Sequence, residues 1–268
     1  MTSGRTPDPR ARRARGGILS LGLAAAATLL LVSPTAAQRG PVPPPSGLPP
    51  DVLSLACAPI LAYTEPVLGL RITGGQDSFA RRNFAPGDLV TINAGTRNNV
   101  TVGQRFFVRR PQVSRSEPIT RATPAVVRTA GWVEVYAVDE TMSLASVAHA
   151  CDAVEVGDFL EPFVLPEVPA ADATVAPAQR ENYGRVMMGQ DRRRSFGRGD
   201  YLTIDRGSEH GVAPGTRFVL YRDRRLAENF LFELGEAVAM DVRPDSSTLQ
   251  VLTSLDAIQE GDYAAMRR

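Results

Sequence analysis

Residues 87–93 read Gly-Asp-Leu-Val-Thr-Ile-Asn, and residues 199–205 read Gly-Asp-Tyr-Leu-Thr-Ile-Asp, a shift of 112 positions. The same shift relates five further pairs: Gly95 and Gly207, Val100 and Val212, Gly103 and Gly215, Phe106 and Phe218, and Arg110 and Arg222. Repetition on this scale indicates two copies of one folding unit.

The match continues downstream with a shift of 104, in the pairs Gly131 and Gly235, Val138 and Val242, Ser143 and Ser247, Val147 and Val251, and Asp152 and Asp256. The difference of eight residues falls between Arg110 and Gly131. Since loops tolerate changes of length better than paired strands do, we expect a surface loop there.

The pattern inside each copy is that of β-strands. Val90 and Ile92 alternate with less apolar neighbours, and Phe106 and Val108 face away from Arg105, Phe107 and Arg109. Alternation with a period of two between glycine-rich turns predicts half-buried antiparallel strands. We therefore expect an all-β protein of two tandem small antiparallel domains, each barrel-like or a sandwich.

Composition marks the boundaries of these domains. We expect a signal peptide (1–37), a proline-rich spacer (38–50), a first β domain with an N-terminal arm (51–163), a proline- and alanine-rich linker (164–180) and a second β domain (181–268). Residues 51–69 are expected to form a strand or a packing arm of the first domain.

The N-terminus has the layout of a secretory signal peptide. Five arginines precede an apolar run from Gly17 to Val32, and the small residues Thr35-Ala36-Ala37 precede a cleavage point at Gln38. The run is shorter than the ~20 residues that span a bilayer, which favours a cleaved signal peptide. An uncleaved membrane anchor is the alternative. We predict export to the periplasm or cell envelope, with membrane contact only through this segment.

Charge argues against nucleic-acid binding. All 30 basic residues are arginine, and removal of residues 1–37 lowers the formal net charge from +1 to about −3. A nearly neutral, slightly acidic protein lacks the basic surface that nucleic acid requires.

The two cysteines, Cys57 and Cys151, are the candidate disulfide of an exported protein. Cys151 aligns with Leu255, which predicts a buried apolar site where a free cysteine would also be stable. Lipidation of Cys57 is a third, weaker reading, because Leu53-Ser54-Leu55-Ala56 faintly matches a lipobox.

Glycine and aspartate recur at matched turns. Glycine reaches positive φ at little cost, and aspartate accepts hydrogen bonds from nearby amides. We assign structural turn roles to Gly87, Asp88, Gly157, Asp158, Gly199, Asp200, Gly211, Gly261 and Asp262. A calcium site is the alternative for these carboxylates, but no loop is dense in ligands.

The candidate partner contacts are Arg81, Arg82, Arg193 and Arg194, which precede a matched phenylalanine in each copy, and Trp132, which aligns with Glu236. The arginines are either a solvated turn or an anion-binding surface. The variable loop from Pro111 to Arg128 is a further contact candidate.

No motif indicates catalysis, a metal or a cofactor. Ser208, Glu209 and His210 are neighbours in one turn and cannot take triad geometry. His149 aligns with Thr253 and has no partner at ligand spacing. We therefore predict a protein that is not an enzyme.

The second copy, from Leu202 to Gly215 and from Gly235 to Thr253, resembles the β-domain of the rod-shape-determining protein MreC. The repeated unit also looks like units of the flagellar assembly protein FlgT and of LysM-associated envelope proteins. The resemblance covers roughly 70 residues per copy and implies the fold rather than an activity. No coiled coil follows the apolar N-terminus as it does in MreC.

Together these features predict a non-enzymatic binding or scaffolding protein of the bacterial envelope, with a protein or glycan partner. An envelope hydrolase or small-ligand binder with a cleft between the two copies is one alternative. An accessory protein of a flagellum or secretion apparatus is another.

Overall fold

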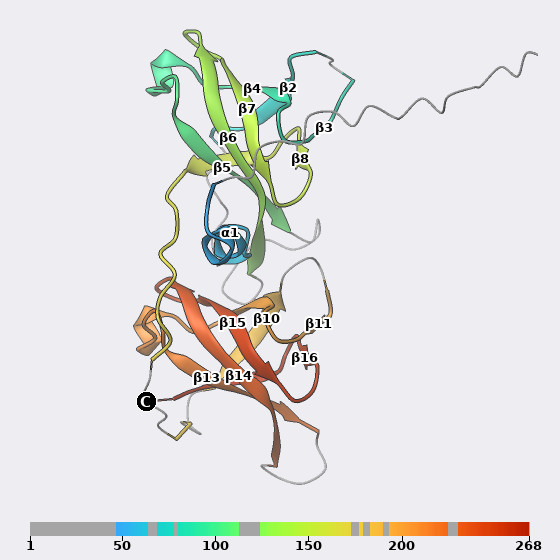
Figure 1. Ribbon diagram of the computed structural model, residues 1–268, viewed down its shortest axis with the longest axis vertical. Helices are drawn as coiled ribbons and strands as arrows, with labels where there is room; N and C mark the ends of the chain where they lie inside the picture. Colours follow the sequence, from blue (N-terminus) through green and yellow to red (C-terminus); the bar gives the residue numbers. More distant parts are fainter. Residues whose placement is uncertain are drawn as a thin grey trace, which may run out of the picture. The chain divides into compact units, whose positions relative to one another are not determined.

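The computed structural model describes residues 47–63, 69–77, 80–112, 124–172, 177–178, 183–189, 193–224 and 230–267 (Figure 1). The predicted signal peptide and most of the predicted spacer lie outside these residues. Within them, no helix has the length and hydropathy needed to cross a membrane.

The first copy is an antiparallel sheet with the strand order β2-β4-β7-β6-β5-β9. A bridge between Arg71 and Phe159 joins the two ends of this sheet. Its core includes Ile72, Val90 and Val133. Its elements are β2 (Ile72–Gly75), β3 (Asn83–Phe84), β4 (Leu89–Ile92), the 3-10 helix η1 (Thr96–Asn98), β5 (Arg105–Gln112), β6 (Ala125–Val138), β7 (Ser143–Ala150), β8 (Val154–Glu155) and β9 (Phe159–Pro162).

The second copy is a closed barrel with the strand order β10-β12-β15-β14-β13-β17, which repeats the order of the first strand for strand. Val186, Leu202 and Ala237 lie in its core, as matched residues do in the first copy. The all-β fold class is confirmed. The elements are β10 (Gly184–Gly189), β11 (Ser195–Phe196), β12 (Tyr201–Ile204), η3 (Ser208–His210), β13 (Arg217–Asp223), β14 (Leu231–Val242), β15 (Ser247–Ser254), β16 (Ile258–Gln259) and β17 (Tyr263–Met266).

One matched glycine shows why the repeat keeps its sequence. Gly131 and Gly235 both have φ of 151°, and a Cβ there would lie 2.1 Å from the carbonyl oxygen of His149 or Thr253 respectively. Each glycine follows a bulge at which β6 or β14 bends against its hairpin partner. A side chain at either position would push the neighbouring strand away.

The N-terminal arm is a helix and a strand. Residues 51–69 are expected to form a strand or a packing arm of the first domain; Ile60–Ala62 form such a strand, β1, whereas Pro50–Ala56 form a helix, α1, and residues 64–68 lie outside the described residues. Pro49 is the N-cap and Pro50 opens the helix, where its missing N–H is no loss. The predicted spacer therefore ends before residue 49.

The arm also contacts both copies. Strand β1 pairs with the start of β6 in the first copy. On the other side, Leu55 and Ala58 pack against Tyr201, Val238 and Met240 of the second copy.

The variable connection is only partly a loop. Residues 111–128 were expected to be loop throughout, yet β5 continues to Gln112 and β6 begins at Ala125. Gln112 pairs with Val126, and β1 pairs with Ala125–Val127 on the other side of β6. Residues 113–123 lie outside the described residues.

The linker from residue 164 has no strand as far as residue 170, but it contacts the second barrel beyond that point. The amide of Asp172 donates to the carbonyl of Gly215, and Arg217 Nε donates to the carbonyl of Asp172. Ala178 forms a β-bridge with Arg267. Asp172 and Ala178 of the linker are thus held on the second barrel.

Candidate functional site

The aspartates of all four Gly-Asp pairs accept a hydrogen bond from the backbone amide three residues upstream. These bonds run from Ala85 to Asp88, Glu155 to Asp158, Gly197 to Asp200 and Gln259 to Asp262, at 2.6–2.8 Å. The preceding glycines have φ between 86° and 98°. The matched Gly-Asp pairs therefore close turns, and their carboxylates are committed to the backbone.

Two of these aspartates also hold a matched arginine. Arg110 Nε and Nη2 donate to the two carboxylate oxygens of Asp158 at 2.6 and 2.8 Å, and Arg222 binds Asp262 at 2.8 and 2.7 Å. The pKa of each arginine is raised, chiefly by this hydrogen bonding. Burial acts the other way on Asp158 and raises its pKa. Sequence alignment paired the arginines and the aspartates separately, but it gave no signal that they meet.

The arginine clusters are partly neutralised in the same repeated manner. Arg81 pairs with Asp88, and Arg193 pairs with Asp200 at 2.7 Å. Arg82 and Arg194 are exposed. Of the four arginines assigned to partner contact, Arg81 and Arg193 are therefore paired with turn aspartates, and the assignment itself stays a prediction.

Trp132, the remaining candidate for partner contact, is a buried packing residue. It is 4% exposed and packs with Phe107 and Ala56 under α1. Its ring stacks on His149, with centroids 4.4 Å apart. The residue departs from the repeat because Ala56 of α1 packs against it in the first copy, whereas the matched Glu236 pairs with Arg217 and Arg267.

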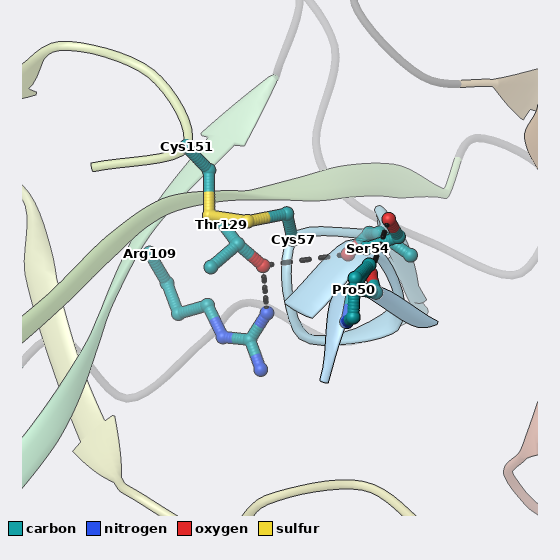
Figure 2. The surroundings of a disulfide bond; sticks show 7 residues. Pro50, Ser54, Cys57, Arg109, Thr129 and Cys151 are labelled. Carbon is teal, nitrogen blue, oxygen red and sulfur yellow. Dashed lines mark hydrogen bonds between the residues drawn. A yellow bond between two sulfur atoms is a disulfide. The ribbon is translucent and has the colours of Figure 1, made fainter. Parts of the chain in front are cut away.

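A disulfide joins the end of α1 to the first barrel (Figure 2). Cys57 and Cys151 are bonded, with their Cα atoms 5.6 Å apart and 94 residues between them in sequence. Cys151 is half-buried against the apolar cluster of Ala56, Phe107 and Trp132, but the matched Leu255, from which this site was inferred, is 74% exposed. The position is a surface one that α1 covers in the first copy alone.

A buried arginine sits beside this disulfide (Figure 2). Arg109 is 8% exposed, and its Nη1 donates to the Thr129 hydroxyl, which in turn donates to the carbonyl of Ala58 at 3.3 Å. Its Nε lies 3.3 Å from a Glu161 carboxylate oxygen. Burial lowers the pKa of Arg109 to about 10, and the Glu161 charge opposes that effect. This chain of contacts holds the turn that follows α1.

His149, Asp152 and Ser54 line one open pocket of about 250 Å³ beside the disulfide. Ser54 Oγ donates to the carbonyl of Pro50, and Asp152 pairs with Arg128 at 2.5 Å. Among the described residues, neither side chain bonds His149, so the three do not form a nucleophile–base–orienter chain. Burial lowers the pKa of His149, which favours the neutral imidazole.

The same histidine lies within 4.8 Å of both cysteine sulfurs. Two cysteines and a histidine can bind a soft metal only when both cysteines are thiolates. In this structure the sulfurs are bonded to each other, so the cluster has a disulfide and one imidazole to offer.

His210 lies apart from that pocket and has a local role. Its Nδ1 accepts the amide hydrogen of Gly207 at 3.1 Å, as Asn98 Oδ1 accepts that of Gly95 in the first copy. Gly211 then takes a left-handed φ of 83°. The side chain closes the turn around η3.

No family model matches the chain, and no curated protein matches it either. The resemblance to the MreC β-domain and to FlgT and LysM-associated domains stays a prediction.

Proposed function

We propose that the protein is an exported, non-enzymatic binding and scaffolding protein of the bacterial envelope, with an envelope protein or glycan as its partner. The observation that carries this proposal is the use of α1. One short helix is bonded to the first barrel through Cys57 and packs Leu55 on the second barrel. Such a segment suits a molecule that presents two linked binding surfaces.

The fate of the matched polar residues supports the proposal. The turn aspartates and their arginines serve both copies in the same way, as turn closures and ion pairs. A disulfide is typical of an oxidising compartment, which supports export.

The export part is tested by expressing the full chain, with a C-terminal tag, in a bacterial host that has a periplasm. We expect osmotic shock to release a protein that begins at Gln38. We also expect alkylation followed by mass spectrometry to find no free thiol. A cytoplasmic protein with both thiols free would refute export.

The binding part is tested by chemical crosslinking of the tagged protein in envelope fractions and on immobilised cell-wall glycan. We expect saturable retention of one protein or glycan. A variant in which both exposed arginines are replaced, Arg82→Ser with Arg194→Ser, separates a charge-dependent contact from one made elsewhere. The absence of retention in both assays would refute a binding function.

The His149 pocket favours a second candidate, a small-ligand binder or envelope hydrolase. Ester, amide and glycoside substrates, tested with the wild type and His149→Ala, distinguish the two functions. Turnover that is lost in His149→Ala would replace the scaffolding proposal with the enzymatic one. No turnover in either protein is the result we expect.

A further inference from the structure

Each copy has an outer sheet face beside β4 or β12, and the chain covers this part of the face only in the second copy. All four residues of β12 are buried, whereas in the matched strand β4 only every second residue is. The inward residues of both strands lie in the barrel cores. The difference therefore comes from the outward side chains, Tyr201 and Thr203 in the second copy and Leu89 and Thr91 in the first.

In the second copy this face is covered by the chain's own N-terminal segment. Leu55 and Ala58 pack on Tyr201, Val238 and Met240, which are 2%, 3% and 6% exposed. The Thr248 hydroxyl donates to the carbonyl of Pro59 at 2.8 Å, so the contact also has a fixed polar point. The cover is short, apolar and helical up to Ala56.

In the first copy the same face is open. Tyr136 takes the place of Met240, at the same bulge in the long strand, and is 69% exposed. Met142 is 47% exposed. A shallow pocket of about 270 Å³ lies on this face, which we call the open face, next in sequence to Tyr136. The pocket is lined by Thr91, Ala137, Val138, Asp139, Met142, Ser143 and Leu144.

We propose that the open face binds a short apolar helical segment of a partner protein, with the chemistry of this chain's own Leu53–Ile60. The matched surface of the second copy, at Tyr201, Val238 and Met240, holds such a segment. The segment of this chain cannot serve, because Cys57 bonds it to Cys151 and Ile60 pairs with Val127. A second molecule of this protein has its own segment bonded and paired in the same way. The occupant is therefore another protein.

This inference rests on the proposed binding function and assigns the open face as the surface that contacts the partner. The probe is a fluorescein-labelled peptide of residues 49–62 that carries Cys57→Ser, titrated into the oxidised full chain and followed by anisotropy. We expect saturable binding that Tyr136→Glu weakens at least ten-fold. The matched control is Phe230→Glu, at an aromatic residue that is 54% exposed on the second copy, and it should bind like the wild type.

Three outcomes overturn the inference. One is no saturable binding at peptide concentrations up to about 1 mM, which corresponds to about −4 kcal/mol. Another is binding that Tyr136→Glu leaves unchanged, since the site would then lie elsewhere. The third is self-association, measured by analytical ultracentrifugation, that Tyr136→Glu abolishes. The occupant would then be a second molecule of this protein.

Failure here is distinguishable from failure of the proposed function. A protein that is retained by envelope material but ignores the peptide loses the open-face assignment and keeps its binding function. A protein that binds the peptide but remains in the cytoplasm loses the envelope assignment and keeps the open face.

Discussion

Residues at matched positions of the two copies make the same contacts, as well as having the same identity. Arg110 grips Asp158 with two nitrogens and also donates to the carbonyl of Ala153, and Arg222 makes the matched bonds to Asp262 and Ala257. The Asp158 carboxylate is 2% exposed and its arginine 20%. A pair this sheltered is costly to break, because the remaining charge is left without a partner.

We expect Asp158→Ala to lower the free energy of unfolding of the first copy by about 3 kcal/mol or more. Trp132, the chain's single tryptophan, reports urea unfolding of that copy by fluorescence. The matched control is Asp77→Ala, whose carboxylate is 67% exposed in its pair with Arg81, and which should cost at most about 1 kcal/mol. Equal effects of the two substitutions would refute a structural role for the Arg110–Asp158 pair.

The lowered pKa of His149 predicts a dependence of stability on pH. Burial against Trp132 disfavours the imidazolium, so the unfolded chain binds the proton better than the folded one. Stability from this group is therefore present above the ordinary histidine pKa of about 6.5 and is lost as the pH falls below it. We expect the melting temperature of the wild type to fall more between pH 7.5 and 5.5 than that of His149→Asn.

His210 is present in both proteins, so the difference between the two melting curves isolates His149. Asp152 and Arg128 line the same pocket and are also common to both. Parallel curves for the wild type and the variant would contradict the prediction.

At the scale of elements, α1 is the part that the sequence did not predict. It has seven residues and therefore too few turns for an apolar stripe to be recognised, and its leucines also fit a strand. The glycine turns could be predicted because a matched pair such as Gly87 and Gly199 indicates a backbone conformation with positive φ, which depends only on local sequence. The Arg110–Asp158 pair could not be predicted, because it joins residues 48 positions apart that meet only when the sheet closes.

The disulfide makes α1 testable as an element. We expect Cys57→Ser with Cys151→Ser to lower the free energy of unfolding by about 2–4 kcal/mol, because the bond closes a long loop. Trp132 packs beside Ala56, so emission from the folded variant should also shift to longer wavelength as α1 loosens. Treatment of the wild type with a phosphine reductant is the matched control and should give the same two changes. An unaltered emission maximum and melting temperature would show that packing alone holds the helix.

At the scale of the whole molecule, the duplication is exact in topology but unequal in environment. The strand order, the bulges and the turn aspartates repeat. The residues that do not repeat gather where α1 lies, such as Trp132 against Glu236 and Cys151 against Leu255. Alignment of the copies therefore predicted the fold well. It did not predict that Trp132 is buried, because a covering segment leaves no mark in the pattern of the strand it covers.

This inequality gives a prediction in which one substitution is made at matched positions. Met240 is 6% exposed beneath Leu55, whereas Tyr136, at the same bulge in the first copy, is 69% exposed. Met240→Glu would bury a charge with no partner, and we expect it to lower the free energy of unfolding by about 3 kcal/mol or more. Tyr136→Glu places its carboxylate in water and should change stability by no more than about 0.5 kcal/mol. Urea denaturation followed by far-ultraviolet circular dichroism compares the two, and equal losses would mean that α1 does not distinguish the two copies.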